Sequence, residues 1–251
     1  MSTRKVAIVT GAGRNIGRDI ALALGEHGIA VAVVDRDAGL AKEVADELVG
    51  LHGDGSAVPV ACDVTDEAQV VSMVAEAAES LGGVHYLVNN VAATDRGATV
   101  LDLSLPEWNT IFEICVTSTF LCTKWAARRM VDQKSGGAIV NIGSTSGYYG
   151  RANALAYPMA KSALFGLTKS MAIQLGPHGI RVNLVAPNRA GSPVGQSEIN
   201  PARKTPNLIG RAAEPADVAR VVRFLLSDEA GFVTGADLLV DGGALLVGTG
   251  N

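Results

Sequence analysis

A glycine-rich turn near the beginning of the chain limits the possible folds more than any other feature. An apolar run over residues 5–10 leads directly into Thr-Gly-Ala-Gly-Arg-Asn-Ile-Gly at 10–17, and a helical pattern follows to about residue 27. Small residues in such a turn let the backbone approach a pyrophosphate, and the free N–H groups at the helix start point toward it. This order predicts a nucleotide-binding unit of a parallel α/β fold. A tight turn that binds nothing is the alternative, because lone glycine-rich turns are common.

Apolar runs and helical patterns alternate along the rest of the chain without a long polar break. Hydrophobic residues make up 48% of the 251 residues but aromatic residues only 4%, so the core must consist mostly of Ala, Val, Leu and Ile. Such small side chains suit a parallel sheet covered by helices on both faces, and the alternation favours one large α/β domain over two small ones. The further apolar runs cover residues 29–34, 57–61, 86–88, 138–142, 180–185 and 238–240.

Charge and cysteine usage narrow the classes of partner and compartment. The net charge is −4 and no block of Lys or Arg stands out, which argues against a nucleic-acid partner. The three cysteines lack a Cys-x-x-Cys spacing, so we expect a reduced, cytoplasmic protein. The four histidines are scattered, so we expect no metal. The first residues lead directly into an apolar run, so we expect no signal peptide, and no stretch of 18 uninterrupted apolar residues occurs, so we expect no membrane span.

The acid that closes the second apolar run bears on the choice of cofactor. Asp35 lies eighteen residues after Gly17, close to the spacing of about 20 at which a carboxylate accepts hydrogen bonds from an adenosine ribose. Its charge would repel a 2′-phosphate, which favours NAD over NADP. Arg14 and Arg36 could attract that phosphate instead. We give Asp35 more weight, because its carboxylate would occupy the position that the phosphate needs.

Polar residues also close the third and fourth apolar runs. Asp63 could face an adenine ring or cap the helix that starts near Asp66. Asn89 and Asn90 offer both donors and acceptors, which suits either a backbone staple or a ribose contact.

A tyrosine and a lysine four residues apart suggest acid/base chemistry. On a helix, Tyr157 and Lys161 would lie on one face, where an ammonium stabilises a phenolate whose pKa is otherwise about 10. Pro158 is tolerated only in a first helical turn, so the helix should begin close to Tyr157. Ser144 follows the apolar run that ends at Ile142, and its hydroxyl could reach the same space. By itself the Tyr-x-x-x-Lys pattern is weak, because chance supplies it in many helices.

In combination these motifs resemble the short-chain dehydrogenase/reductase family over essentially the whole chain. The resemblance rests on Thr-Gly-x-x-x-x-Ile-Gly at 10–17, Asp35, Cys-Asp-Val at 62–64, Asn-Asn at 89–90, Ser144, Tyr157-x-x-x-Lys161 and Val-Asp-Gly-Gly at 240–243. It implies a single Rossmann-type doubly wound α/β domain over residues 1–251, with a seven-stranded parallel sheet and helices on both faces. It also implies a homotetramer.

The resemblance also implies a reaction and a set of site residues. A hydride would pass between a secondary alcohol or ketone and NAD, with NADP less favoured. Ser144 would orient the substrate oxygen, Tyr157 would act as general base or acid, and Lys161 would assist the phenol and hold the nicotinamide ribose. Residues 188–210 would close over the substrate. The implied cofactor-binding residues are Gly11, Arg14, Asn15, Ile16, Gly17, Asp35, Arg36, Asp63, Val64, Asn90, Ala92, Tyr157, Lys161, Pro187, Ala190 and Ser192.

Several positions depart from the family pattern, among them Val91 and Ala92, which replace the common Ala-Gly after Asn-Asn. Cys115 stands in a helical pattern over residues 105–132, where relatives carry an asparagine that helps hold a water for proton relay. A thiol would hold such a water poorly, so we expect slower proton relay with hydride transfer retained. Asn15 replaces the middle glycine of the phosphate turn, and asparagine tolerates positive φ. Asn188 replaces the glycine that is usual after Pro187, so here too an asparagine stands in for a glycine.

Two other functions fit parts of the pattern. A cofactor-binding sensor or scaffold with little catalysis would explain Cys115 and Asn188. An NADP-dependent reductase of oxoacyl chains on a carrier protein would use Arg14 and Arg36, together with Arg128 and Arg129; Asp35 opposes its cofactor, and Ile173 stands where carrier-binding relatives tend to be basic. Basic residues near the loop, at Arg189, Arg203, Lys204 and Arg211, could meet an acidic substrate, although solvated surface charge explains them better.

Overall fold

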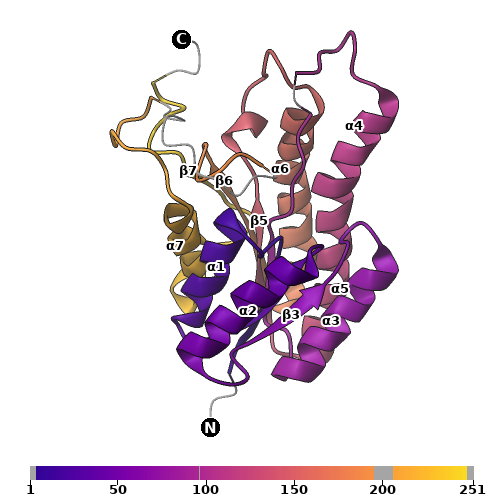
Figure 1. The fold of residues 1–251 in the computed structure, drawn as a ribbon, viewed down its shortest axis with the longest axis vertical. Helices are drawn as coiled ribbons and strands as arrows, with labels where there is room; N and C mark the ends of the chain where they lie inside the picture. Colours follow the sequence, from indigo (N-terminus) through magenta and orange to yellow (C-terminus); the bar gives the residue numbers. More distant parts are fainter. Residues whose placement is uncertain (1–3, 96, 195–205, 248–251) are drawn as a thin grey trace.

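The computed structural model describes residues 4–95, 97–194 and 206–247. In these ranges seven parallel strands form one sheet in the order β3-β2-β1-β4-β5-β6-β7 (Figure 1). The strand order turns back between β1 and β4, which leaves a crevice at the carboxyl ends of these strands. The expected seven-stranded parallel sheet is confirmed. The strands are β1 Val6–Thr10, β2 Ala30–Asp35, β3 Ala57–Ala61, β4 Tyr86–Asn89, β5 Gly137–Ile142, β6 Ile180–Pro187 and β7 Asp237–Val240.

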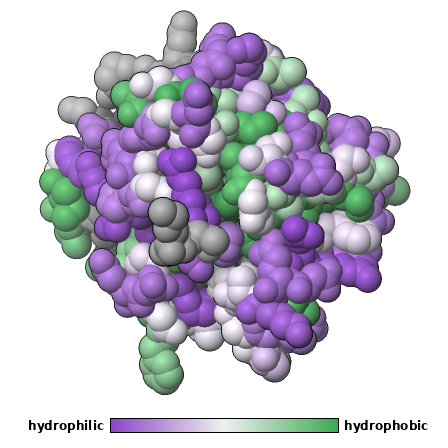
Figure 2. Space-filling model, turned by 90° about the horizontal axis from the view of Figure 1, so that it is seen from below, coloured by the Kyte–Doolittle hydropathy of each residue, from purple (hydrophilic) through white to green (hydrophobic). Residues whose placement is uncertain are grey.

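Helices cover both faces of the sheet. The α-helices are α1 Asn15–Gly25, α2 Ala38–His52, α3 Glu67–Leu81, α4 Leu105–Phe112, α5 Ser118–Gln133, α6 Ala156–Leu175 and α7 Pro215–Leu226. Because side chains alternate along a strand, Ala7 and Val9 of β1 pack in one layer with α1, α2 and α7, while Ile8 packs in the other with α3, α5 and α6. Figure 1 shows α7 beside α1, in agreement with their contacts. Seen from below, polar side chains cover most of the surface (Figure 2).

Carboxylates from the preceding turn cap the helices that follow β2 and β3. Asp37 accepts hydrogen bonds from the first backbone N–H groups of α2, and Asp66 does the same for α3. The cap of α3 is therefore Asp66 rather than Asp63. Asp63 instead accepts from the backbone and hydroxyl of Thr65, at 3.0 and 2.7 Å, which closes the turn before the helix.

The helix expected over residues 105–132 is interrupted. Between α4 and α5 the chain forms a π-helical turn, Glu113–Thr117, which contains Cys115. The hydroxyls of Ser118 and Thr119 donate to the carbonyls of Ile114 and Cys115, at 2.6 and 3.0 Å. These side-chain bonds compete with the backbone ladder and favour the wider turn.

The φ angles show whether the two asparagines that replace glycine adopt the left-handed backbone conformation that glycine allows. Asn15 has a φ of 52°, as its place in the phosphate turn predicts. Asn188 does not adopt positive φ; the next residue, Arg189, does so instead with a φ of 44°. The residue with left-handed backbone therefore follows Asn188 rather than being Asn188 itself.

Among the residues that the structure describes, none of the helices is both long and apolar enough to cross a bilayer. In the same ranges, His, Cys, Asp and Glu side chains do not gather in groups of three that could hold a metal ion.

Candidate active site

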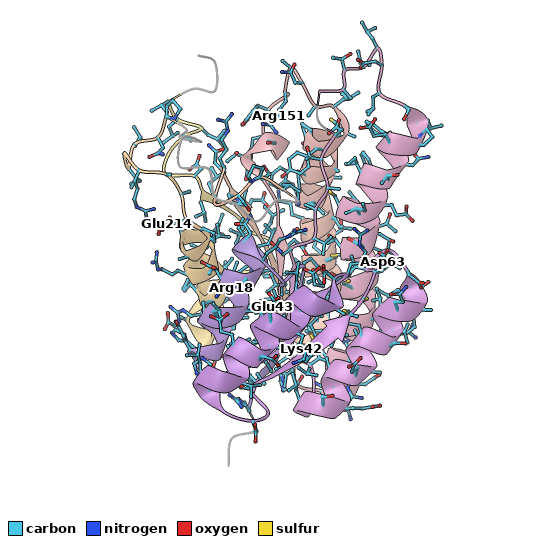
Figure 3. All side chains as sticks on the ribbon, viewed as in Figure 1. Arg18, Lys42, Glu43, Asp63, Arg151 and Glu214 are labelled. Carbon is cyan, nitrogen blue, oxygen red and sulfur yellow. The ribbon has the colours of Figure 1, made fainter. Side chains whose placement is uncertain are left out.

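A cavity of about 890 Å³ opens at the carboxyl ends of the strands. Its volume suits a dinucleotide with a small substrate beside it. Asp63 and Arg151 both line it yet lie well apart in Figure 3, so the cavity is elongated. The catalytic and cofactor-binding residues that the family resemblance implies all line it: Gly11, Arg14, Asn15, Ile16, Gly17, Asp35, Arg36, Asp63, Val64, Asn90, Ala92, Ser144, Tyr157, Lys161, Pro187, Ala190 and Ser192.

The glycine-rich turn brings the start of α1 close to the end of β1. Gly11 has a φ of 62°, and a Cβ on Gly17 would lie 2.1 Å from the Gly11 carbonyl oxygen, so only glycine allows this approach. Asn90 secures the turn from β4. Its side-chain nitrogen donates to the carbonyls of Thr10 and Gly11 at 3.1 and 3.0 Å, which is the backbone staple rather than a free ribose contact.

Two backbone N–H groups hold the carboxylate of Asp35 at the edge of the cavity. One carboxylate oxygen accepts from the backbone N–H of Gly13 and the other from that of Asp37, each at 3.1 Å. A Cβ on Gly13 would lie 2.9 Å from the carboxylate, so this glycine is needed for the close contact. The acid is thereby oriented beside the turn, whereas Arg36 is exposed.

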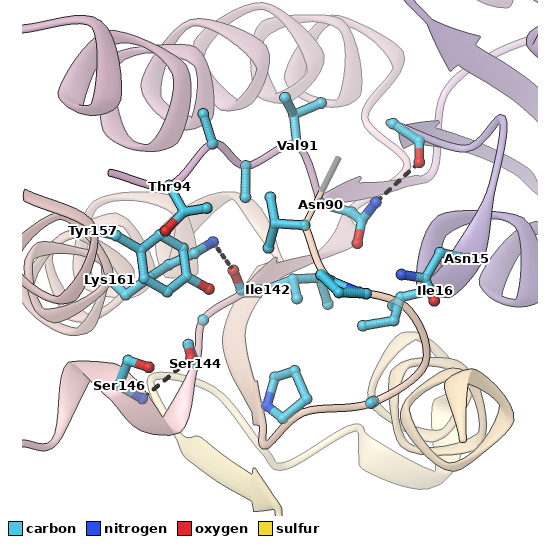
Figure 4. A pocket seen from close by; sticks show the side chains of 18 of the residues that line it. Asn15, Ile16, Asn90, Val91, Thr94, Ile142, Ser144, Ser146, Tyr157 and Lys161 are labelled. Carbon is cyan, nitrogen blue, oxygen red and sulfur yellow. Dashed lines mark hydrogen bonds between the residues drawn. The ribbon is translucent and has the colours of Figure 1, made fainter. Parts of the chain in front are cut away.

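The three candidate catalytic side chains converge inside the same cavity (Figure 4). Ser144 follows β5, and its Oγ accepts a hydrogen bond from the Ser146 N–H at 3.1 Å, which leaves the hydroxyl hydrogen to point elsewhere. Tyr157 is the second residue of α6, so the helix begins close to the tyrosine as Pro158 predicted. One turn later, Lys161 places its ammonium 5.9 Å from the centroid of the Tyr157 ring.

Lys161 is among the most deeply buried residues of the protein. Its side chain is 2% exposed, and Nζ donates to the carbonyl of Ile142 at 2.7 Å. Burial lowers the pKa of the Lys161 ammonium below its ordinary value, with the nearby Cys115 thiol acting in the opposite direction. The lowered pKa makes this ammonium a stronger acid than a surface lysine.

Cys115 faces the wall of the site from the π-helical turn. It is completely buried, and its sulfur lies 3.5 Å from both the backbone nitrogen and the carbonyl oxygen of Ala93. The thiol therefore packs against the peptide group of Ala93. A side-chain amide in its place could donate to the Ala93 carbonyl and accept from the Ala93 N–H. Cys115 also lies close enough to Lys161 to affect the pKa of its ammonium, at the position where the family resemblance implies an asparagine.

The basic residues considered for an acidic substrate fall into separate groups. Arg189 lines the cavity. Arg211 instead forms a two-pronged ion pair with Asp217, with N···O distances of 2.6 and 2.7 Å. Arg203 and Lys204 lie outside the described residues, as do residues 195–205 of the expected 188–210 loop.

Several cavity residues were not identified from the sequence. The main ones come from two loops, residues 91–95 and 146–154, in which neither periodicity nor a short motif marks a position. Only the loops' place after β4 and β5 could have drawn attention to them. The main ones are Thr94, Asp95, Ser146, Arg151 and Asn153.

Comparison with known proteins places this geometry in one family. A family model described as enoyl-(acyl carrier protein) reductase matches residues 11–244. The chain is 38% identical to cis-4-hydroxycyclohexanecarboxylate dehydrogenase of Sinomonas cyclohexanicum over 95% of this chain and 96% of that protein. It is 36% identical to meso-2,3-butanediol dehydrogenase of Serratia marcescens over 96% and 94%.

A solved structure agrees with these relatives. The 3-ketoacyl-(acyl-carrier-protein) reductase of Brucella melitensis complexed with NADH superimposes with a TM-score of 0.88 at 31% identity, covering 96% of this chain and 98% of that one. The fold, the ordered motifs and these relatives lead to one conclusion: the chain belongs to the short-chain dehydrogenase/reductase family, a family of oxidoreductases.

Proposed function

We propose that this protein interconverts a secondary alcohol and a ketone by reversible hydride transfer with NAD. The observation that carries the proposal is the convergence of Ser144, Tyr157 and Lys161 in one cavity with the glycine-rich turn. A hydroxyl, a phenol and a buried ammonium supply the proton chemistry of such a reaction. The turn supplies the anion site for a dinucleotide.

The described residues fit a nicotinamide dinucleotide. The close approach of Gly17 to Gly11 leaves the start of α1 open to a pyrophosphate, and Asp35 stands where an adenosine ribose would lie. When bound, the cofactor supplies the hydride acceptor. Lys161 has three N–H donors, of which Ile142 takes one, so it can also bind the nicotinamide ribose.

The side chains divide the proton chemistry among them. In the oxidation direction Ser144 donates a hydrogen bond to the substrate oxygen and fixes its position. Tyr157 takes the hydroxyl proton as the carbinol carbon loses its hydride, and in reduction it returns that proton to the ketone. The ammonium of Lys161, 5.9 Å from the ring centroid, stabilises the phenolate form.

Asp35 supports NAD over NADP. The backbone N–H groups of Gly13 and Asp37 orient its two oxygens. Its negative charge is therefore fixed at the edge of the cavity, where a 2′-phosphate would have to bind. Two arginines, Arg14 and Arg36, line the same part of the cavity and oppose this preference. A fixed carboxylate is the stronger influence, because the phosphate would have to displace it.

The relatives indicate which alcohols to test. One acts on a hydroxycyclohexanecarboxylate and another on a vicinal butanediol. Both are small secondary alcohols with a second oxygen-bearing group. We propose a substrate of that class, which Arg151, Asn153 or Arg189 on the cavity wall could recognise.

The test is turnover of cis-4-hydroxycyclohexanecarboxylate and meso-2,3-butanediol with NAD and with NADP, followed by absorbance of the reduced cofactor. We expect NAD-dependent oxidation of at least one of them. Tyr157→Phe should remove nearly all turnover while NADH still binds with unchanged affinity. Substantial activity in Tyr157→Phe would refute the mechanism. NADH binding without turnover of any secondary alcohol in a wider screen would favour a sensor or scaffold.

A reductase of carrier-bound oxoacyl chains is the second candidate, because one structural relative has that activity. Two features oppose it. Ile173 is 77% exposed on α6 where a basic residue would help to bind an acidic carrier, and Asp35 disfavours NADPH. NADPH-dependent reduction of acetoacetyl carrier protein faster than reduction of any free ketone would reverse our choice.

We also propose that the protein assembles as a homotetramer, as the family resemblance implies. The solution mass, measured by light scattering on the purified chain, tests this directly. A mass of about four chains is expected, and a monomer would refute it.

A further inference from the structure

The helix that carries Tyr157 has no capping side chain of its own. Its N-cap residue, Leu155, makes no side-chain bond to the first turn, unlike Asp37 before α2 and Asp66 before α3. A helix start leaves its first N–H groups without intrahelical partners, and inside a protein these groups need another acceptor. The acceptor for α6 must therefore come from elsewhere in the fold.

Asp95, some sixty residues earlier in the chain, supplies that acceptor. One carboxylate oxygen accepts from the backbone N–H groups of Leu155 and Ala156 at 2.7 and 2.6 Å. The other accepts from the N–H of Tyr157 itself at 2.9 Å. Asp95 is 1% exposed. A carboxylate so deeply buried is stable there because three N–H groups and the positive end of the helix dipole surround it.

We propose that Asp95 is a positioning residue for the proton-transfer step, which fixes Tyr157 through the first turn of α6. No residue intervenes between the carboxylate and the backbone of Tyr157. Both oxygens are occupied by backbone donors, which argues against a direct role for Asp95 as a proton acceptor. Its role is therefore to set where the phenol lies. The inference rests on the proposed alcohol dehydrogenase function.

The segment that carries Asp95 links Tyr157 to the cofactor side of the cavity. Five residues earlier, Asn90 binds the carbonyls of Thr10 and Gly11 in the glycine-rich turn. Between them, Ala93 contacts the thiol of Cys115 through both its nitrogen and its oxygen. The chain from 90 to 95 is thus attached to the phosphate turn at one end and to the catalytic helix at the other. It sets the separation between the cofactor site and the phenol.

This arrangement predicts a defect in the chemical step rather than in cofactor binding. Reactions between positioned groups are sensitive to small displacements, and a shift of about 1 Å can cost on the order of a hundredfold in rate. Asp95→Asn keeps the size of the side chain but replaces one acceptor oxygen by an amide NH2 group that faces N–H donors. Asp95→Ala removes both acceptors. We expect kcat to fall about tenfold in the first and about a hundredfold in the second.

Asp66→Ala provides a matched control. Asp66 caps α3 through two backbone N–H groups, and it lies outside the residues that line the cavity. Removing it costs a helix cap without touching Tyr157. If loss of a helix cap lowered kcat only by destabilising the protein, kcat would fall in Asp66→Ala as well. A fall in kcat in the Asp95 variants alone therefore indicates a local effect on Tyr157.

The experiment measures kcat with the faster of the two test alcohols, Kd for NADH by fluorescence, and amide hydrogen exchange over residues 155–157. In Asp95→Asn we expect reduced kcat, Kd within about twofold of wild type, and faster exchange of the Tyr157 amide. Asp66→Ala should retain wild-type kcat. If Tyr157→Phe is inactive but Asp95→Asn turns over at the wild-type rate, the proposed function stands and the role of Asp95 is wrong. An equal loss of kcat in Asp66→Ala would also overturn it.

Discussion

The side chain of Asn15 and the backbone of Ser192 bond to each other in both directions. Asn15 Nδ2 donates to the Ser192 carbonyl at 3.1 Å, and the Ser192 N–H donates to Asn15 Oδ1 at 3.4 Å. Between them Gly191 passes so closely that a Cβ would lie 2.1 Å from Oδ1. A glycine at position 15, which the family resemblance implies, would have no side chain to make these bonds. The phosphate turn is thereby joined to the segment that follows β6.

Asn15→Gly should speed the release of NADH. Glycine accepts the φ of 52°, so the change removes the amide without straining the turn. Two lost neutral hydrogen bonds at about 1 kcal/mol each predict a release rate higher by on the order of ten- to thirtyfold. Stopped-flow displacement of bound NADH measures it. An unchanged release rate would mean that the two bonds do not hold the segment over the cofactor.

A double-mutant cycle checks the same contact independently of the cofactor. Gly191→Ala should lower Tm strongly in the wild-type background, because its methyl would collide with the Asn15 amide. In the Asn15→Gly background the collision with the amide is gone, while the contact with Pro215 Cγ, 2.8 Å from such a Cβ, and the cost of positive φ remain, since Gly191 has a φ of 64°. The penalty should therefore be smaller. Equal penalties in both backgrounds would contradict the contact.

Cys115→Asn should raise turnover. A side-chain amide has both a donor and an acceptor for the Ala93 peptide group that the thiol now contacts at 3.5 Å, and it differs little in volume from cysteine. It would also hold water near Lys161 better than sulfur does, which assists proton relay. Comparing kcat in normal and heavy water would detect a faster proton step. Cys115→Ser serves as the size control, and an equal or lower rate in Cys115→Asn would count against this account.

Asp35→Asn should shift cofactor preference toward NADPH. The amide oxygen can still accept from the Gly13 N–H, so the turn is retained while the charge is lost. We expect the ratio of NADPH to NADH dissociation constants to fall by about tenfold or more, because one charge repulsion near a phosphate is worth over 1 kcal/mol. Asp37→Asn, at a capping residue outside the cavity lining, is the control and should leave that ratio unchanged.

Asp217 makes a contribution to stability that depends on pH. The two-pronged bond from Arg211 lowers the pKa of the Asp217 carboxyl from 3.8 to about 2. Because the folded state favours the carboxylate, this contribution is complete above about pH 4 and is lost as the pH falls through 2. Asp217→Asn should lower Tm at pH 7 by roughly 2–4 °C, the shift for about 1 kcal/mol in a chain of this size. The difference should shrink in melts between pH 4 and 2. A constant difference would exclude the charged interaction as its source.

Local chemistry along the chain was sufficient for much of this structure. A proline and acids mark the first turn of α7, which begins at Pro215 and ends at Leu226. Asn15 was expected at positive φ, and Tyr157 near a helix start. Each of these features is decided by residues a few positions apart, through backbone conformation, caps and side-chain periodicity.

What the sequence determined, then, is the order of strands and helices, the glycine-rich turn and the identity of the Ser144, Tyr157 and Lys161 set. The tertiary structure alone decided that Asp95 caps the helix of Tyr157, that Asn15 binds Ser192, and that Cys115 sits in a π-helical turn against Ala93. These partners lie from 22 to 177 positions apart. No local pattern encodes such pairs, because they meet only when packing of the sheet and its helices brings the loops together at the carboxyl ends of the strands.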